Sequence, residues 1–339
     1  MEGIKKILES LVHIGTVSGY EPMAEKYLCG LSGFDKIERD SLGSFVLTKK
    51  SLKENAPKVL IDAHLDTVGF MVTEIKEGGF LKVVNVGGLD TRVLPATEVI
   101  IYGKKEIYGV VTSTPPHLKK GGNKLPEISE LMIDTGYTKD VLCELVELGD
   151  PVAYKPRLDC LLNDYVCANS LDDKACCAAA IDAVMNTDKK DLTCDVYLAI
   201  SAEEEVGKAG PARVAFGVQP DFAIITDVNF ARGEGIENYE SIESQKGASV
   251  SISAVCDRTL TRNIISLLKK ENIPHQINCD PSYTGTNNEA ISISGIGVRT
   301  SVISVPLKSM HTPSEIVSLK DLKSLSNILK AIITTKEEL

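Results

Sequence analysis

The sequence predicts an α/β protein: a mostly parallel sheet covered by helices on both faces, with a small β-barrel-like domain inserted into it. Short apolar runs alternate with segments of helical periodicity toward both ends of the chain, which is typical of parallel strands buried on both faces. Between residues 68 and 165, glycine-punctuated β-like runs replace this alternation. The length of 339 residues favours about two domains.

The two outer segments, residues 1–67 and 166–339, supply the elements of the larger, catalytic domain. Apolar residues at helical spacing predict helices over 3–14, 21–32, 171–187, 258–271 and 318–335. Ser170 is the expected cap of the helix over 171–187. Strands are expected over 35–49 (broken at 41–43), 58–63, 194–201, 221–227 and 301–305.

The inserted segment, residues 68–165, reads as a compact β module. Strands are expected over 70–75, 80–86, 97–102, 106–112 and 151–155. Helical periodicity is confined to about 138–147.

Composition disfavours several classes of function. The net charge is −10 and no basic block occurs, so neither nucleic acid nor an anionic membrane is an expected partner. The absence of Trp counts against a carbohydrate cleft. No apolar run is long enough to span a bilayer, and the N-terminus lacks the apolar region of a signal peptide. Nine cysteines without a CxxC pair predict reduced, buried thiols in a cytoplasmic protein.

Acidic and imidazole side chains follow the predicted strands of the larger domain. They are His64-Leu65-Asp66, Glu203-Glu204-Glu205, Asp227 and His311, with Asp172-Asp173 at the start of a helix. Singly, a glutamate triplet can be a solvated turn and an aspartate pair can cap a helix. However, open α/β sheets bind ligands beyond the carboxyl ends of their strands, so we expect these groups to converge.

Such a set indicates metal chemistry. Neighbouring carboxylates repel one another unless protons or cations neutralise them. Histidines mixed with carboxylates suit divalent zinc, cobalt or manganese. Five side chains suffice for two ions if one carboxylate bridges them. Paired ions can activate a water and polarise a carbonyl, and a further carboxylate must then carry the proton to the leaving amine.

These residues resemble a known family, the dinuclear-metal aminopeptidases that include glutamyl and deblocking aminopeptidases and the tetrahedral (TET) particles. The resemblance covers essentially the whole chain. It rests on Ala63-His64-Leu65-Asp66-Thr67-Val68-Gly69-Phe70, Ser170-Leu171-Asp172-Asp173-Lys174, Glu204-Glu205-Val206-Gly207, Asp227-Val228, and Pro306-Leu307-Lys308-Ser309-Met310-His311-Thr312-Pro313-Ser314-Glu315. A segment from Gly109 to Leu118 also matches.

The resemblance implies a role for each matching residue. Asp172 would bridge two divalent metal ions per subunit, zinc or cobalt being expected. His64 and Asp227 would complete one site, and Glu205 and His311 the other. Glu204 would be the general base, and Asp66 would hold His64 through its other ring nitrogen. The β module would be a PDZ-like dimerisation domain in a homo-oligomer built from dimers, up to a dodecamer.

The chain departs from the family pattern at two positions. Lys174 stands where the family often has Arg, which keeps the charge but loses the bidentate fork. Asn287 stands where the family's Gly-Thr-Asp has Asp, which removes a negative charge near the expected substrate pocket and bears on substrate preference. His117 lies in a matching segment, and we expect a structural role for it.

The leading hypothesis is therefore a metal-dependent aminopeptidase that releases N-terminal residues from short peptides. Two alternatives share the residue pattern. The first is a related amidohydrolase acting on acylated amino acids, which would need no free amine. The second is a catalytically weak family member acting as a scaffold. Glycoside hydrolysis by two carboxylates fits poorly with two metals and no Trp.

Overall fold

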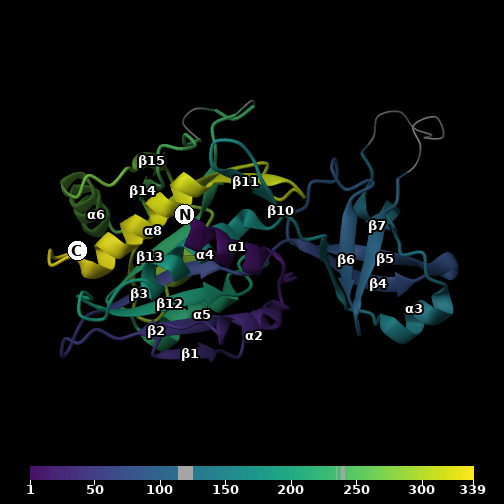
Figure 1. The fold of residues 1–339 in the computed structure, drawn as a ribbon, viewed down its shortest axis with the longest axis horizontal. Coiled ribbons are helices and arrows are strands. Elements are labelled where there is room, and N and C mark those ends of the chain that lie inside the picture. Colours follow the sequence, from purple (N-terminus) through teal and green to yellow (C-terminus); the bar gives the residue numbers. More distant parts are fainter. Residues whose placement is uncertain (114–124, 234, 238–240) are drawn as a thin grey trace.

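An α/β body, at left in Figure 1, carries a separate β-barrel at right. The computed structural model describes residues 1–113, 125–233, 235–237 and 241–339. His117 lies outside these ranges. The expected fold class is confirmed, because the chain forms one large sheet covered by helices and one small closed barrel.

The large sheet has eleven strands and a parallel centre. The strands are β1 (Lys36–Arg39), β2 (Phe45–Lys49), β3 (Lys58–His64), β10 (Leu158–Cys160), β11 (Tyr165–Ala168), β12 (Asp195–Ser201), β13 (Phe222–Phe230), β14 (Ser249–Ser253), β15 (Gln276–Asp280), β16 (Arg299–Lys308) and β17 (Glu315–Ser318). Their order is β1-β2-β12-β3-β13-β16-β17-β11-β10, with β14 beside β16 and β15 beside β14. Strands β12, β3, β13 and β16 run parallel, and β15 pairs parallel with β14, whereas the other neighbouring strands pair antiparallel. The site lies at the four-stranded parallel centre.

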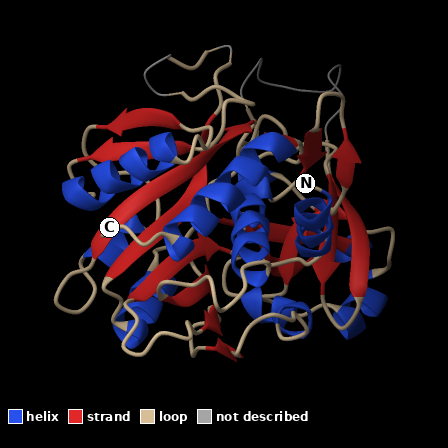
Figure 2. Cartoon of the chain, turned by 60° about the vertical axis from the view of Figure 1, so that its left-hand side comes forward, coloured by secondary structure: helices blue, strands red, loops and turns tan. Residues whose placement is uncertain are grey.

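Helices cover both faces of this sheet (Figure 2). One face packs against α1 (Glu2–Val12), α4 (Leu171–Met185), α6 (Arg258–Lys270) and α8 (Leu319–Thr334). The other face packs against α5 (Ala209–Val218) and α7 (Asn288–Ser292). Along β3, Val59 and Ile61 belong to the first core and Leu60 to the second. Burial on both sides explains why this strand is a continuous apolar run.

All the predicted helices are present, but one of them is shorter than predicted. The helix expected over 21–32 is a 3₁₀ turn, η1 (Glu21–Ala24), followed by α2 (Glu25–Leu28), and glycines at 30 and 33 follow it. Helix α5 was not expected, because its sequence contains Gly210-Pro211 and Gly217 and gives little helical signal.

The barrel closes through six antiparallel strands in the order β4-β5-β8-β7-β6-β9. They are β4 (Gly69–Ile75), β5 (Phe80–Val86), β6 (Glu98–Tyr102), β7 (Glu106–Val111), β8 (Ile133–Asp134) and β9 (Pro151–Tyr154), accompanied by α3 (Lys139–Leu145), η2 (Glu77–Gly79) and η4 (Ile128–Glu130). Strand β8 was not predicted from the sequence, because a segment of two residues is too short to show an alternating pattern. The segment 68–165 contains all six barrel strands and also β10, which pairs with β11 in the large sheet.

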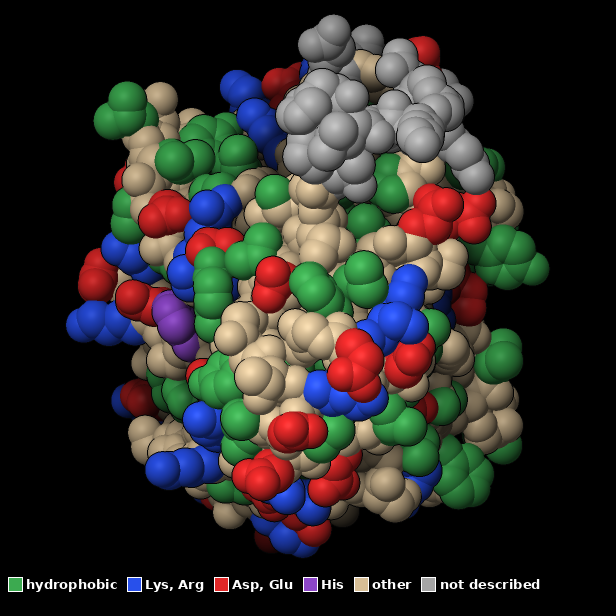
Figure 3. Space-filling view, turned by 90° about the vertical axis from the view of Figure 1, so that its right-hand side faces the viewer, with side chains coloured by type: hydrophobic (Ala, Val, Ile, Leu, Met, Phe, Trp, Pro, Cys, Tyr) green, Lys and Arg blue, Asp and Glu red, His purple; other side chains and the backbone are tan. Residues whose placement is uncertain are grey.

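The barrel surface is mixed in character. On the face shown in Figure 3, lysine, arginine and acidic side chains lie among apolar ones. Within the barrel segment, the exposed apolar side chains include Val84, Tyr108, Val141 and Leu148.

The nine cysteines are all free. Cys176, Cys177 and Cys194 are buried, but Cys29, Cys143, Cys160 and Cys279 are exposed. The expectation of generally buried thiols is therefore wrong, because four of them lie on surface segments. Among the described residues, none of the helices combines the length and apolar character needed to cross a bilayer.

Candidate metal centre

The carboxyl ends of the central parallel strands meet the N-terminus of α4 at one cavity. His64 ends β3, directly beside Ser201 at the end of β12. Asp227 lies in β13, and the segment after β16 brings in His311. Six of the seven predicted site residues line this cavity of about 500 Å³, namely His64, Asp172, Glu204, Glu205, Asp227 and His311. The parallel register and the start of α4 thus gather residues from five distant segments.

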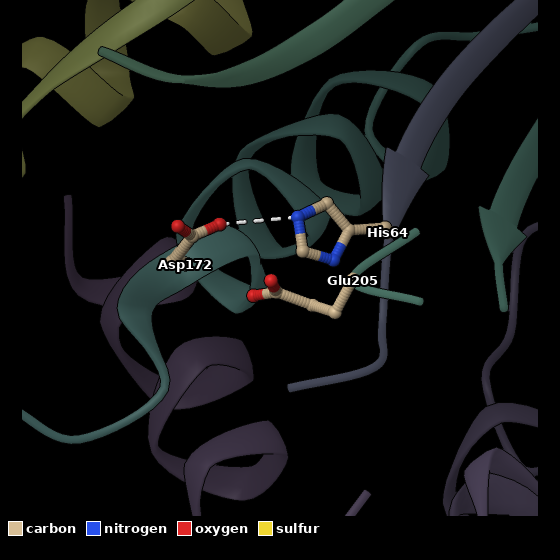
Figure 4. A group of neighbouring side chains, drawn as sticks. All are labelled: His64, Asp172 and Glu205. Carbon is tan, nitrogen blue, oxygen red and sulfur yellow. Dashed lines mark hydrogen bonds and ion pairs between the residues drawn. The ribbon is translucent and has the colours of Figure 1, made fainter. Parts of the chain in front are cut away.

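Asp172 lies between the two histidines. Its Oδ1 atom is 3.0 Å from His64 Nε2, and its Oδ2 atom is 3.2 Å from His311 Nε2. Figure 4 shows the first contact, with the Glu205 carboxylate beside it. His64 Nε2 also lies 3.9 Å from Asp227 Oδ1, and His311 Nε2 lies 3.3 Å from Glu205 Oε1. One carboxylate therefore offers one oxygen to each imidazole.

Carboxylates outnumber basic groups at this centre, and the resulting electrostatics favours added positive charge. Burial raises the pKa of Asp227 well above its usual value, and the neighbouring Asp173 raises it further. Burial alone would lower the pKa of His311, but its contacts with Asp172 and Glu205 raise it to about 11. The two histidines thus offset part of the negative charge of the surrounding carboxylates. Divalent ions bound by the same nitrogen and oxygen atoms would offset it as well.

Asp173 also lies at this centre, although the sequence indicated no role for it there. Ligand atoms of His64, Asp173 and Asp227 lie within 4.8 Å of one another, as do those of His64, Asp172 and Glu205. Both carboxylate oxygens of Asp173 are buried without a hydrogen-bond partner. Glu205 Oε1 is buried as well, and its ion-pair contact is His311 Nε2 at 3.3 Å. Buried carboxylate oxygens without hydrogen bonds, as in Asp173, fit a site that accepts cations.

Asp66 does not line the cavity, but it holds His64 and the backbone of Glu204 and Glu205 in position. Its Oδ1 atom is 3.5 Å from His64 Nδ1, whose hydrogen-bond contact is to the Asp66 carbonyl oxygen at 2.9 Å. The same carboxylate accepts the backbone N–H groups of Glu204 and Glu205 at 3.0 and 3.1 Å. Ser18 Oγ donates to it at 2.6 Å. Asp66 therefore fixes one imidazole and the glutamate turn together.

Glu204 faces the cavity beside one lysine. Lys208 Nζ lies 3.3 Å from Glu204 Oε1 and also contacts Glu289 at 3.2 Å and the Thr286 carbonyl at 2.6 Å. Burial raises the pKa of Glu204, although His64 and Lys208 act to lower it. A carboxylate with a raised pKa is suited to taking up and releasing a proton near neutral pH.

Glu315 anchors the site from β17, a role that the sequence did not reveal. One of its oxygens accepts the backbone N–H of His311 at 2.6 Å. The other accepts the N–H groups of Leu171 and Asp172 at 2.6 and 3.2 Å. The expected side-chain cap by Ser170 is therefore wrong: Ser170 makes no such bond. A buried carboxylate distant in sequence holds this helix start instead.

The two departures from the family pattern lie outside the cavity lining. The Asn287 side chain is buried, and its Nδ2 atom donates to Asp62 Oδ2 at 2.7 Å and to Ser201 Oγ at 3.0 Å. Asn287 follows Thr286, which lines the cavity, but its own side chain turns into the sheet. The expected effect of Asn287 on substrate preference stays a prediction. Lys174 is buried and donates to the Ile14 carbonyl at 2.7 Å.

The M42 glutamyl aminopeptidase family matches this chain over residues 43–328. The chain belongs to this family. A lysyl aminopeptidase from Pyrococcus furiosus is 30% identical over 342 residues, covering 98% of this chain and 96% of the relative.

Solved structures of an aminopeptidase and of a TET1 peptidase share this fold. An aminopeptidase from Desulfurococcus kamchatkensis superposes with a TM-score of 0.89 at 26% identity, covering 98% of this chain and 94% of that one. The TET1 peptidase of Pyrococcus horikoshii, which can assemble into a tetrahedron or a large octahedral shell, gives a TM-score of 0.86 at 28% identity. It covers 97% of this chain and 99% of that one. The protein is therefore an aminopeptidase of the M42 family.

Proposed function

We propose that this M42 aminopeptidase uses two divalent metal ions to release N-terminal residues from short peptides. The observation that carries the proposal is the position of Asp172, which directs one carboxylate oxygen toward His64 and the other toward His311. A carboxylate in this position is suited to bridge two ions.

The remaining donors divide into two sets around this carboxylate. His64 and Asp227 would hold one ion with Asp172, and Glu205 and His311 would hold the other. Imidazole and carboxylate donors fit zinc or cobalt. When bound, such ions polarise a scissile carbonyl and lower the pKa of a bound water.

Glu204 is the proposed general base. It lines the cavity beside the ligand Glu205, and its carboxylate would take a proton from the attacking water. As the C–N bond breaks, Glu204 would deliver this proton to the nitrogen of the leaving amine. Asp66 supports both steps, because it holds the backbone of Glu204 and Glu205 and the ring of His64.

The test uses aminoacyl p-nitroanilides together with their N-acetylated counterparts. The protein is first treated with a chelator and then supplied with zinc or cobalt. We expect cleavage of the free-amine set only, lost on chelation and restored by metal. Cleavage of the acetylated set would instead indicate an amidohydrolase, and metal binding without any cleavage would indicate a scaffold.

We also propose a homo-oligomer in which the barrel is the dimerisation domain, with assembly up to a dodecamer. The TET1 structure and the exposed apolar side chains of the barrel support this. Light scattering of the purified chain tests it, and a monomeric mass would contradict it. The nine free cysteines favour a reducing, cytoplasmic location.

A further inference from the structure

The lining of the cavity at the candidate metal centre includes an additional carboxylate, Asp280. Asp280 is the last residue of β15 and is partly exposed. It belongs neither to the proposed ligand set nor to the proposed proton path.

Two neighbouring strands hold this carboxylate in place. Asn278 Nδ2 donates to Asp280 Oδ2 at 2.9 Å, and Asn278 Oδ1 accepts from Ser251 Oγ at 3.1 Å. Ser251 is buried on β14, directly beside Asn278 in the strand register. The second oxygen, Asp280 Oδ1, has no hydrogen bond or ion pair with any residue that the structure describes. The carboxylate is thus positioned on one side and free on the other.

None of the described residues that line the cavity is a lysine or arginine that could pair with Asp280, and the two imidazoles lie against Asp172. Lys208 is outside the lining and is held by Glu204, Glu289 and the Thr286 carbonyl. An acidic substrate side chain near Asp280 would therefore meet a like charge and no lysine or arginine of this lining.

Apolar side chains also line this cavity. They are Val228, Phe230, Pro281, Val302 and Met310. Apolar walls combined with a free carboxylate fit a long side chain with an aliphatic stem and a cationic end. Lysine and arginine have this form.

We propose that Asp280 is a specificity-determining residue that selects substrates whose first residue is lysine or arginine. Its free oxygen would receive the ammonium or guanidinium group of that residue. This inference rests on the proposed aminopeptidase function and names its substrate class.

The experiment compares kcat/KM for Lys, Arg, Leu and Glu p-nitroanilides in metal-restored protein. The wild type is expected to favour Lys and Arg. Asp280→Asn should lower kcat/KM for these two by about 10- to 100-fold, with a clearly smaller change for Leu. Asp280→Lys should shift the preference toward Glu. Glu271→Gln, which removes an exposed charge outside the cavity, should leave all four values unchanged.

The Leu substrate separates the possible failures. Equal losses for Lys and Leu in Asp280→Asn would overturn the inference, because the carboxylate would then act on the α-amine or on the fold. Wild-type cleavage of Leu or Glu in preference to Lys and Arg would also overturn it, while leaving the aminopeptidase function intact. Cleavage of no substrate after metal addition would refute the proposed function and this inference together.

Discussion

At the scale of single residues, the centre depends on how buried carboxylates are neutralised. Asp172 contacts the imidazoles of His64 and His311, whereas Glu204 forms an ion pair with Lys208. The proposed metal ligands and the proposed general base are therefore separable by substitution. This separation gives the first prediction.

Glu204→Gln is expected to lower kcat by orders of magnitude while leaving metal binding intact. The amide keeps the shape of the side chain but cannot accept and return a proton. Activity assays and metal content of the purified variant measure the two effects. Glu203→Gln is the matched control, because Glu203 is adjacent in sequence but does not line the cavity. Full activity in Glu204→Gln would mean that the base is another group.

Asn287→Asp is expected to destabilise the chelated protein by about 1–3 kcal/mol at pH 8. It would place two buried carboxylates together, since Asn287 Nδ2 is 2.7 Å from Asp62. Burial raises the pKa of Asp62 to about 6, even though Asn287 and Ser201 lower it. A carboxyl with a raised pKa in the folded state destabilises that state above its unfolded-state pKa. The difference from wild type should therefore shrink as the pH falls toward the range in which both carboxyls are protonated.

Urea unfolding at pH 8 and pH 5 measures this difference. The exchanged double variant Asp62→Asn with Asn287→Asp should recover much of the lost stability, because it restores one amide beside one carboxylate. No recovery in the double variant would mean that the contact between the two side chains does not set the cost.

At the scale of elements, the start of α4 and the segment after β16 are held by one side chain of β17. Glu315 accepts N–H groups from both of them. Burial and the nearby Asp172 together raise the pKa of Glu315 to about 8, although the three backbone N–H donors act to lower it. The positions of the proposed ligands Asp172 and His311 therefore depend on the same anchor.

Glu315→Gln is expected to weaken zinc affinity by about 10- to 100-fold. The amide would present its NH₂ group to one of the backbone N–H donors, so one segment would lose its acceptor. Calorimetric zinc titration measures the effect. Unchanged affinity, with folding checked by circular dichroism, would show that this anchor does not position the ligands.

At the scale of the whole molecule, the parallel centre of the sheet gathers the site and the barrel stands apart from it (Figure 1). The site joins segments that begin with β3 and extend beyond β16. Cations that neutralise the carboxylates of the site would therefore link the two parts of the chain that flank the barrel.

Metal removal is expected to lower the melting temperature, because the buried carboxylates then lose their proposed cations. Zinc at about a thousand times its dissociation constant should restore about 4 kcal/mol of stability. Differential scanning calorimetry with and without zinc measures this shift. Glu204→Gln should keep the shift and Asp172→Ala should lose it. An equal shift in both variants would contradict the assigned ligands.

The sequence by itself determined the fold class, most strands and helices, and the residue types of the site. These features are local: apolar periodicity defines an element, and donor chemistry defines what it can bind. The order of strands in an α/β sheet then predicts that residues following parallel strands converge. His64, Asp172, Glu204, Glu205, Asp227 and His311 do line one cavity.

Only the tertiary structure decided which side chains are partners across the chain. Glu315 and Leu171 are 144 residues apart, and Asn287 and Asp62 are 225 apart. No local pattern encodes such contacts, because they form only when packing brings separate elements together. The same reason explains the closure of the barrel by β8 and the position of Asp280 in the cavity. Local chemistry thus specified which groups the site contains, and packing specified what each group contacts.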